Sequence, residues 1–126
     1  MKSLITGVAG FIGSHLAEKL LQEGHEVLGI DKFLDNYPRN LKDNSLSVFA
    51  QHPKFSFLDQ DLMLVDLKQL LSDVTYVFHL AGQPGVRASW GQDFAKYSEN
   101  NIRATQMLLE AAKDLKLAKS VSGFTV

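Results

Sequence analysis

The sequence predicts an α/β protein built on a doubly wound parallel sheet. Strand-like and helix-like patterns alternate along the 126 residues, and a glycine-rich turn joins the first strand to the first helix. The segment Val74–Leu80 is apolar enough for a strand that is buried on both faces, as strands of a parallel sheet are. Right-handed β-α-β connections between such elements give the expected strand order 3-2-1-4-5. Ligands of such sheets bind beyond the carboxyl ends of strands one and four, where the strand order reverses.

The first half of the chain predicts three strands and one long helix. An apolar run precedes Gly7, an apolar stripe at helical spacing follows the glycines, and Gly24 ends that stripe. A short apolar run and an alternating aromatic run supply the next two strands, and the polar stretch between them predicts a loop. The expected elements are the strand Ser3–Thr6, the helix Gly10–Glu23, the strand Glu26–Ile30, the loop Lys32–Pro53 with one short helix around Leu46–Ala50, and the strand Phe55–Asp59.

The second half continues the alternation. A short helical pattern crosses over to the apolar fourth strand, and a loop containing glycine and proline separates that strand from the longest helical pattern. The expected elements are the helix Asp66–Ser72, the strand Val74–Leu80, the loop Ala81–Gly91, a helix from about Gln92 to Leu115, and a fifth strand at Ser120–Val126. One domain therefore occupies residues 1–126.

Composition narrows the possible functions. The net charge is −1 with no block of like charges, which does not favour binding to nucleic acid or to a membrane surface. The chain has no cysteine, so it holds no disulfide and no zinc–thiolate site. No apolar run approaches the length of a membrane span, and the histidines share no metal-ligand spacing. We therefore expect a cytoplasmic protein without a metal site.

The turn after the first strand predicts a dinucleotide site. Gly7 lets the chain turn sharply, Gly10 removes a side chain that would keep a diphosphate from the backbone, and Gly13 allows close packing of the helix. Phe11 and Ile12 complete the turn at a helix N-terminus, whose N–H groups attract an anion. Asp31 lies 18 residues beyond Gly13, close to the spacing at which an acid accepts hydrogen bonds from an adenosine ribose.

These motifs resemble those of a known family. The segment from Thr6 to Gly13 is similar to the T-G-x-x-G-x-x-G opening of the extended short-chain dehydrogenase/reductases, which include NAD-dependent nucleotide-sugar epimerases and dehydratases. Further matching segments follow in the expected order, and the strand-four turn is most similar to that of UDP-glucuronate and UDP-glucose 4-epimerases. These segments are Asp31–Tyr37, Asp61–Leu62, His79–Arg87 and Asn101–Thr105. The resemblance implies a Rossmann-type fold, NAD as the cofactor and a nucleotide-sugar as the substrate of the parent enzyme.

The resemblance also implies roles at the adenosine end of the cofactor. Asp31 would accept from the ribose hydroxyls and repel a 2′-phosphate, which favours NAD over NADP, although the neighbouring Lys32 weakens that preference. Asp61 would accept from the adenine amino group, with Leu62 against the ring. Asp59 is a competing acid two residues earlier.

At the other end, Leu80, Ala81 and Gly82 would line the nicotinamide-ribose and diphosphate side of the site. Gln83 would bond to the cofactor or to the substrate. Asn101 would either lie near the cofactor or bond to a backbone group of strand four. We expect His79, which is embedded in strand four, to be a structural residue with satisfied hydrogen bonds rather than a base.

The residues for hydride chemistry are missing from the chain. The family uses a Tyr-x-x-x-Lys pair, and none of the three tyrosines has a lysine four residues later. We therefore expect an inactive N-terminal, cofactor-binding portion of a longer enzyme, with the substrate domain outside the chain. An open sheet edge beside strand five predicts a homo-oligomer. The alternatives are a non-catalytic NAD(P)-sensing module, which would also lack the Tyr-Lys pair, and a transferase fold that binds S-adenosylmethionine.

Overall fold

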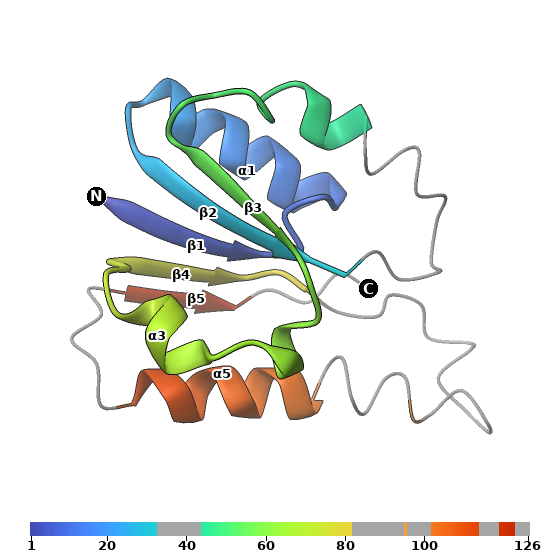
Figure 1. Ribbon diagram of the computed structural model, residues 1–126, viewed down its shortest axis with the longest axis vertical. Helices are drawn as coiled ribbons and strands as arrows, with labels where there is room; N and C mark the ends of the chain where they lie inside the picture. The colour runs from blue at the N-terminus through green and yellow to red at the C-terminus, as the bar shows by residue number, and fades with distance from the viewer. Residues whose placement is uncertain (33–43, 82–94, 96–101, 114–118, 123–126) are drawn as a thin grey trace.

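The computed structural model describes residues 1–32, 44–81, 95 and 102–113, together with the backbone of residues 119–122. Within these residues the core is one five-stranded parallel sheet of order β3-β2-β1-β4-β5, which confirms the predicted topology (Figure 1). Its strands are β1 (Lys2–Thr6), β2 (Glu26–Asp31), β3 (Phe55–Asp59), β4 (Tyr76–His79) and β5 (Lys119–Ser122).

The strand boundaries agree with the sequence to within a few residues. β3 matches its predicted range, whereas β4 is shorter than predicted. Its start is delayed because the backbone N–H of Val74 donates to the carbonyl of Leu71 and so continues the turn out of the preceding helix. The last four residues predicted for the fifth strand, 123–126, lie outside the described part of the chain.

Helices cover both faces of the sheet. Figure 1 shows α1 on one face and both α3 and α5 on the other. The helices are α1 (Phe11–Gln22), the 3-10 turn η1 (Leu62–Leu64), α3 (Leu67–Leu71) and α5 (Ala104–Ala112). The short helix predicted near Leu46–Ala50 is one helical turn at residues 44–47. Of the helix predicted from about 92 to 115, the structure describes residue 95 and residues 102–113, which include α5; residues 92–94, 96–101 and 114–115 lie outside the described part of the chain.

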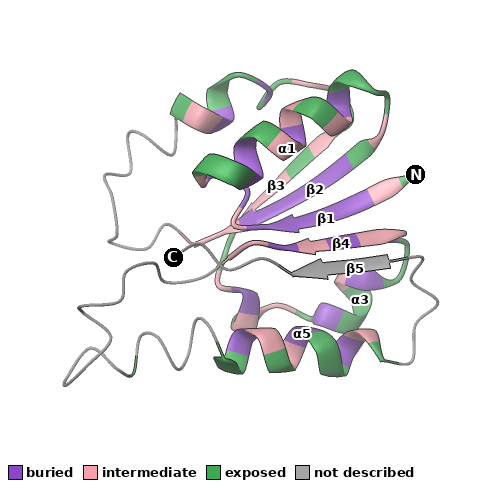
Figure 2. Cartoon of the chain, turned by 180° about the vertical axis from the view of Figure 1, so that it is seen from behind, coloured by how far each residue is buried: buried purple, intermediate pink, exposed green. Residues whose placement is uncertain are grey.

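The central strand β1 sends alternate side chains into two separate core layers, because successive residues of a strand point to opposite faces. Leu4 packs with residues of α3 and α5, whereas Ile5 packs with residues of α1. Both side chains are fully buried, as are most residues of β1 and β2 in Figure 2. Complete burial of an aliphatic side chain stabilises the fold by about 1.5–3 kcal/mol. The apolar strand pattern is thus explained by helices on both sides.

Helix α1 ends as its sequence predicts. Gly24 has φ +87°, its N–H donates to the carbonyl of Leu21, and the N–H of His25 donates to that of Leu20. This pair of bonds is a Schellman motif, which a residue with positive φ closes. The motif directs the chain straight from α1 into β2.

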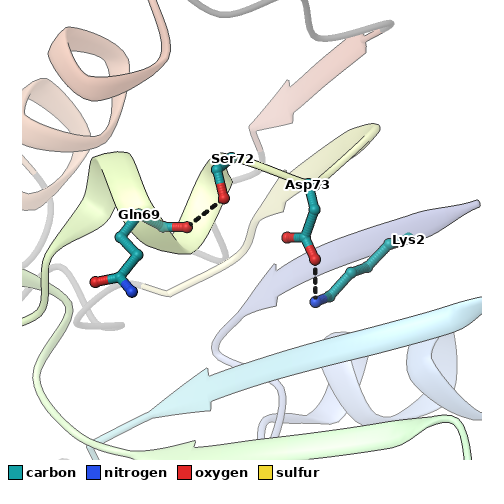
Figure 3. A network of polar contacts seen from close by, with 4 residues as sticks. All are labelled: Lys2, Gln69, Ser72 and Asp73. Atoms are coloured by element: carbon teal, nitrogen blue, oxygen red, sulfur yellow. Dashed lines mark hydrogen bonds and ion pairs between the residues drawn. The ribbon is translucent and has the colours of Figure 1, made fainter.

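The amino-terminal end of the sheet carries its own ion pair (Figure 3). Lys2 Nζ donates to Asp73 Oδ2 over 2.9 Å, and Ser72 Oγ donates to the carbonyl of Gln69 at the end of α3. The hydrogen bond from Lys2 lowers the pKa of Asp73. This pair lies at the opposite end of β1 from the glycine turn.

Candidate functional site

The glycine turn joins β1 to α1 at the carboxyl end of the sheet. Gly7 has φ +70°, and a Cβ at this position would lie 2.9 Å from the backbone nitrogen of Ala81. A Cβ at Gly13 would lie 2.2 Å from the carbonyl oxygen of Gly7. Both distances are too short for any side chain, so the turn and the first turn of α1 pack backbone against backbone. The predicted packing roles of these two glycines are confirmed, and sequence reasoning did not foresee the contact with Ala81.

Helix α1 begins without a side-chain cap. Gly10 is the N-cap residue, contributes no side-chain acceptor, and no acidic residue lies in the first turn. The first N–H groups of a helix have no acceptor inside the helix, so they are suited to an external anion. Phe11 and Ile12, at this end, are 78% and 47% exposed. The helix start can therefore receive a negatively charged group, and the predicted approach of a diphosphate to Gly10 stays a prediction.

Asp31 ends β2 beside this turn. Its Oδ2 accepts a hydrogen bond from the backbone N–H of Ala9 over 3.0 Å, and the N–H of Gly7 donates to the carbonyl of Ile30. The carboxylate therefore both fixes the glycine turn and lies next to it, half-buried at the carboxyl end of the sheet. This is the arrangement that places an acid near a ribose when a diphosphate lies on the helix start.

Asp61 lies on the turn that follows β3 and is tied to Lys32. Lys32 Nζ lies 3.1 Å from Asp61 Oδ2, while Asp61 Oδ1 accepts from the backbone N–H of Met63 and caps η1. Leu62 is only 7% exposed and packs in the core, so little of its side chain remains for contact with a ligand. Asp59, the competing acid, is exposed. The sequence indicates each of these charges but not the ion pair between Lys32 and Asp61.

A buried polar network joins the glycine turn to the end of β4. Thr6 Oγ1 accepts from the N–H groups of Leu80 and Ala81, over 3.0 and 3.1 Å, and lies 2.7 Å from His79 Nδ1. A hydroxyl has one proton and two acceptor lone pairs. Because both lone pairs are occupied, the Thr6 proton goes to His79 Nδ1, which is therefore the acceptor.

The same network fixes the protonation of the histidine. With Nδ1 as acceptor, His79 carries its proton on Nε2 and donates it to Thr105 Oγ1 over 2.8 Å. His79 is 2% exposed, and burial lowers its pKa. Both ring nitrogens have partners, which confirms the structural role predicted for this histidine. The second partner comes from α5, on the far side of the crossover, and no local sequence pattern could have identified it.

Three of the predicted site residues fall outside this description. Gly82, Gln83 and Asn101 belong to the ranges that the structure does not describe. Leu80 and Ala81 are half-buried, and their N–H groups donate to Thr6 Oγ1 just before the glycine turn.

Gly29 in β2 contributes to the site indirectly, and sequence reasoning missed it. A Cβ there would lie 2.7 Å from a methyl group of Val8. The absence of a side chain at Gly29 therefore lets Val8 of the glycine turn pack directly against β2. The signal was present, since a glycine inside an apolar strand often marks a close approach.

The described residues contain no group of three or more His, Cys, Asp or Glu side chains that could hold a metal ion. Across the same part of the chain, no helix is both long and apolar enough to cross a membrane.

The bare glycine turn, the uncapped helix start and the acid at the end of the next strand fit a dinucleotide. Fold and site together therefore define a Rossmann-type domain suited to a dinucleotide. The model of the GDP-mannose 4,6 dehydratase family matches residues 4–125, and the chain belongs to this family. The resemblance found in the sequence is thereby confirmed.

Individual proteins that are similar to this chain agree with the family match. A Bacillus subtilis protein described as an uncharacterized UDP-glucose epimerase is 48% identical over 115 residues, which are 90% of this chain and 36% of the relative. The UDP-glucuronate 4-epimerase of Thermodesulfobacterium geofontis is 38% identical over 97% of this chain and 38% of its own length. The crystal structure of UDP-glucuronic acid 4-epimerase from Bacillus cereus with UDP-glucuronic acid and NAD has a TM-score of 0.93 and 47% identity, covering 97% of this chain and 39% of that one. The chain thus spans less than two fifths of these relatives.

Proposed function

We propose that the chain binds NAD across the carboxyl end of its sheet and is the NAD-binding portion of a nucleotide-sugar epimerase or dehydratase. The observation that carries the proposal is the joint placement of the glycine turn and Asp31. The hydrogen bond from the Ala9 N–H to Asp31 holds the ribose acid against the turn that would receive the diphosphate. Similar proteins support the choice of ligand, since the Bacillus cereus epimerase was crystallised with NAD.

The residues of the chain would divide the coenzyme between them. The first-turn N–H groups of α1 would hold the diphosphate, since a helix N-terminus favours an anion. Asp31 would accept from the adenosine ribose hydroxyls, and Asp61 would lie at the adenine end. Leu80 and Ala81 would form the wall on the nicotinamide side, held in place by Thr6. NAD supplies a reversible hydride acceptor, which suits transient oxidation of a sugar hydroxyl.

The substrate of the whole protein is proposed as a UDP-sugar, because the relatives named above carry that description. The chain itself lacks a Tyr-x-x-x-Lys pair, so we expect no turnover from it alone. A homo-oligomeric state, a cytoplasmic location and the absence of nucleic-acid or membrane partners stay predictions of the sequence.

Calorimetric titration of the chain with NAD tests the proposal. We expect saturable binding that weakens when Asp31→Ala removes the ribose acceptor. Gly24→Ala, at the far end of α1, is the matched control and should leave the affinity unchanged. S-adenosylmethionine should not compete, because it has no diphosphate for the helix start. A chain that binds S-adenosylmethionine but not NAD would contradict the proposal.

A further inference from the structure

Lys32 lies where it can affect the choice between NAD and NADP. It directly follows Asp31, and dinucleotide sites that accept NADP place a cation near this acid to receive the 2′-phosphate. A lysine carries its ammonium on a flexible four-carbon stem, which brings it within reach of a phosphate bound beside the neighbouring residue. By sequence alone, Lys32 would therefore offset the repulsion that Asp31 exerts on NADP.

In the structure the ammonium of Lys32 is paired with a second acid. Lys32 Nζ lies 3.1 Å from Asp61 Oδ2, and the two side chains are only 30% and 23% exposed. A pair that is partly withdrawn from solvent is screened less than a surface pair. The charge of Lys32 is thus committed to a carboxylate on the turn after β3.

Asp61 is itself held in place. Its other oxygen, Oδ1, accepts from the Met63 N–H over 2.9 Å, and the following residue, Leu62, is buried in the core. The acceptor for Lys32 is therefore oriented by the backbone of η1 and does not need to be organised by the lysine.

We infer that Asp61 is a specificity-determining residue that excludes NADP by holding Lys32 away from the 2′-phosphate position. Asp31 repels the 2′-phosphate, and Asp61 binds the Lys32 ammonium that would otherwise offset this repulsion. The inference rests on the proposed binding of NAD, which it deepens by assigning coenzyme preference to a second acid.

The test compares NAD and NADP affinities of four chains by calorimetry at low, fixed ionic strength. These are the wild type, Asp61→Asn, Lys32→Gln and the double variant. Asparagine retains a side-chain oxygen that can accept from the Met63 N–H, so the cap on η1 is kept while the ion pair is lost. Both coenzymes carry the same adenine, so a lost contact to that ring cancels in the ratio of the two affinities.

We expect Asp61→Asn to raise the affinity for NADP relative to NAD by about tenfold, which corresponds to about 1.4 kcal/mol. Most of this gain should vanish in the double variant, because the released lysine carries it. Removing Lys32 should therefore change the coenzyme ratio far more in the Asp61→Asn background than in the wild type. Such non-additivity is the signature of two coupled residues.

Asp73→Asn is the matched control. It also removes a lysine–aspartate pair, with a 2.9 Å contact, but at the amino-terminal end of the sheet. It should leave the coenzyme ratio unchanged. The gain in Asp61→Asn should also shrink at high salt, since it is electrostatic.

The outcomes separate the two proposals. If the wild type binds NAD and Asp61→Asn gains nothing for NADP, the inference is wrong and the proposed function stands. If the double variant keeps the full gain, direct repulsion by Asp61 explains it and the role given to Lys32 is wrong. If the wild type binds neither coenzyme, the proposed function fails and the inference fails with it.

Discussion

Removal of the Thr6 hydroxyl should have a large effect on the stability of the fold. Thr6 is fully buried, and its Oγ1 joins the glycine turn to the end of β4 through three hydrogen bonds. Thr6→Val removes the hydroxyl and replaces it with a methyl group of similar size. The expected loss of stability therefore comes from the polar groups left behind and not from a cavity.

The structure sets the size of that loss. The N–H of Leu80 keeps a second acceptor, because it also donates to the backbone carbonyl of Thr6 over 3.2 Å. The N–H of Ala81 and Nδ1 of His79 lose their acceptor and donor, respectively. A buried polar group left without a partner costs about 1–3 kcal/mol, so the buried Nδ1 of His79 should cost about 2 kcal/mol, and the half-buried Ala81 N–H, which water can reach, should add on the order of 1 kcal/mol.

Urea unfolding of wild type and variant measures this loss as a shift in the midpoint at constant slope. Thr105→Val should cost less, on the order of 1 kcal/mol, because Thr105 is half-buried and water can replace its bond to His79. Thr75→Val is the control, since the Thr75 hydroxyl makes no hydrogen bond among the described residues. A Thr6→Val chain as stable as Thr75→Val would refute the network and the protonation assigned to His79.

Three further predictions follow from the same geometry. Burial lowers the pKa of His79 below its ordinary 6.5, so as the pH falls the unfolded state takes up the proton before the folded state does. The contribution of His79 to the free energy of unfolding should be complete above pH 6.5 and decrease below it, by up to about 1.4 kcal/mol per pH unit. Unfolding experiments from pH 7.5 to 5.5 should show a smaller decrease for His79→Gln. Gly24→Ala should reduce the free energy of unfolding by about 1–2 kcal/mol because of the positive φ alone, since its Cβ would meet nothing within 4 Å. Gly13→Ala should reduce it more and abolish NAD binding, because its Cβ would meet the carbonyl oxygen of Gly7. Equal shifts in the melting temperatures of the two variants would contradict this prediction. Ile102 and Leu109, in and beside α5, are 64% and 56% exposed, and exposed apolar side chains favour association. Sedimentation should therefore show concentration-dependent association that Leu109→Lys weakens. A chain that is monomeric at all concentrations would contradict this prediction.

The sequence predicted most of the fold because its signals are local. Gly7 and Gly24 have the positive φ that their positions require, and the alternating elements fixed a strand order that the structure confirms. Strand-end acids such as Asp31 could also be placed, since a known spacing separates them from the glycine turn. Each of these inferences needs only neighbouring residues and the right-handed crossover.

What the sequence could not predict are contacts between residues far apart in the chain. Thr6 and His79 are 73 positions apart, and His79 and Thr105 are 26 apart. Lys32 and Asp61 are separated by 29 positions and meet only because β2 and β3 are neighbours in the sheet. Pattern and spacing identify which groups are charged or polar, but only the packed sheet decides which partner each group takes.

These distant contacts hold in place the residues that we propose bind NAD at the carboxyl end of the sheet. Asp31 fixes the glycine turn through Ala9, Thr6 fixes the wall at Ala81, and Asp61 is oriented by η1. Each of these acceptors is thus bonded to the backbone before any ligand arrives, and such preorganisation reduces the entropy lost on binding. If this reasoning holds, Thr6→Val should weaken NAD binding as well as folding, because it frees the wall that lies against Gly7. A Thr6→Val chain that is still folded at low temperature and binds NAD as tightly as the wild type would show that the wall is positioned by other contacts.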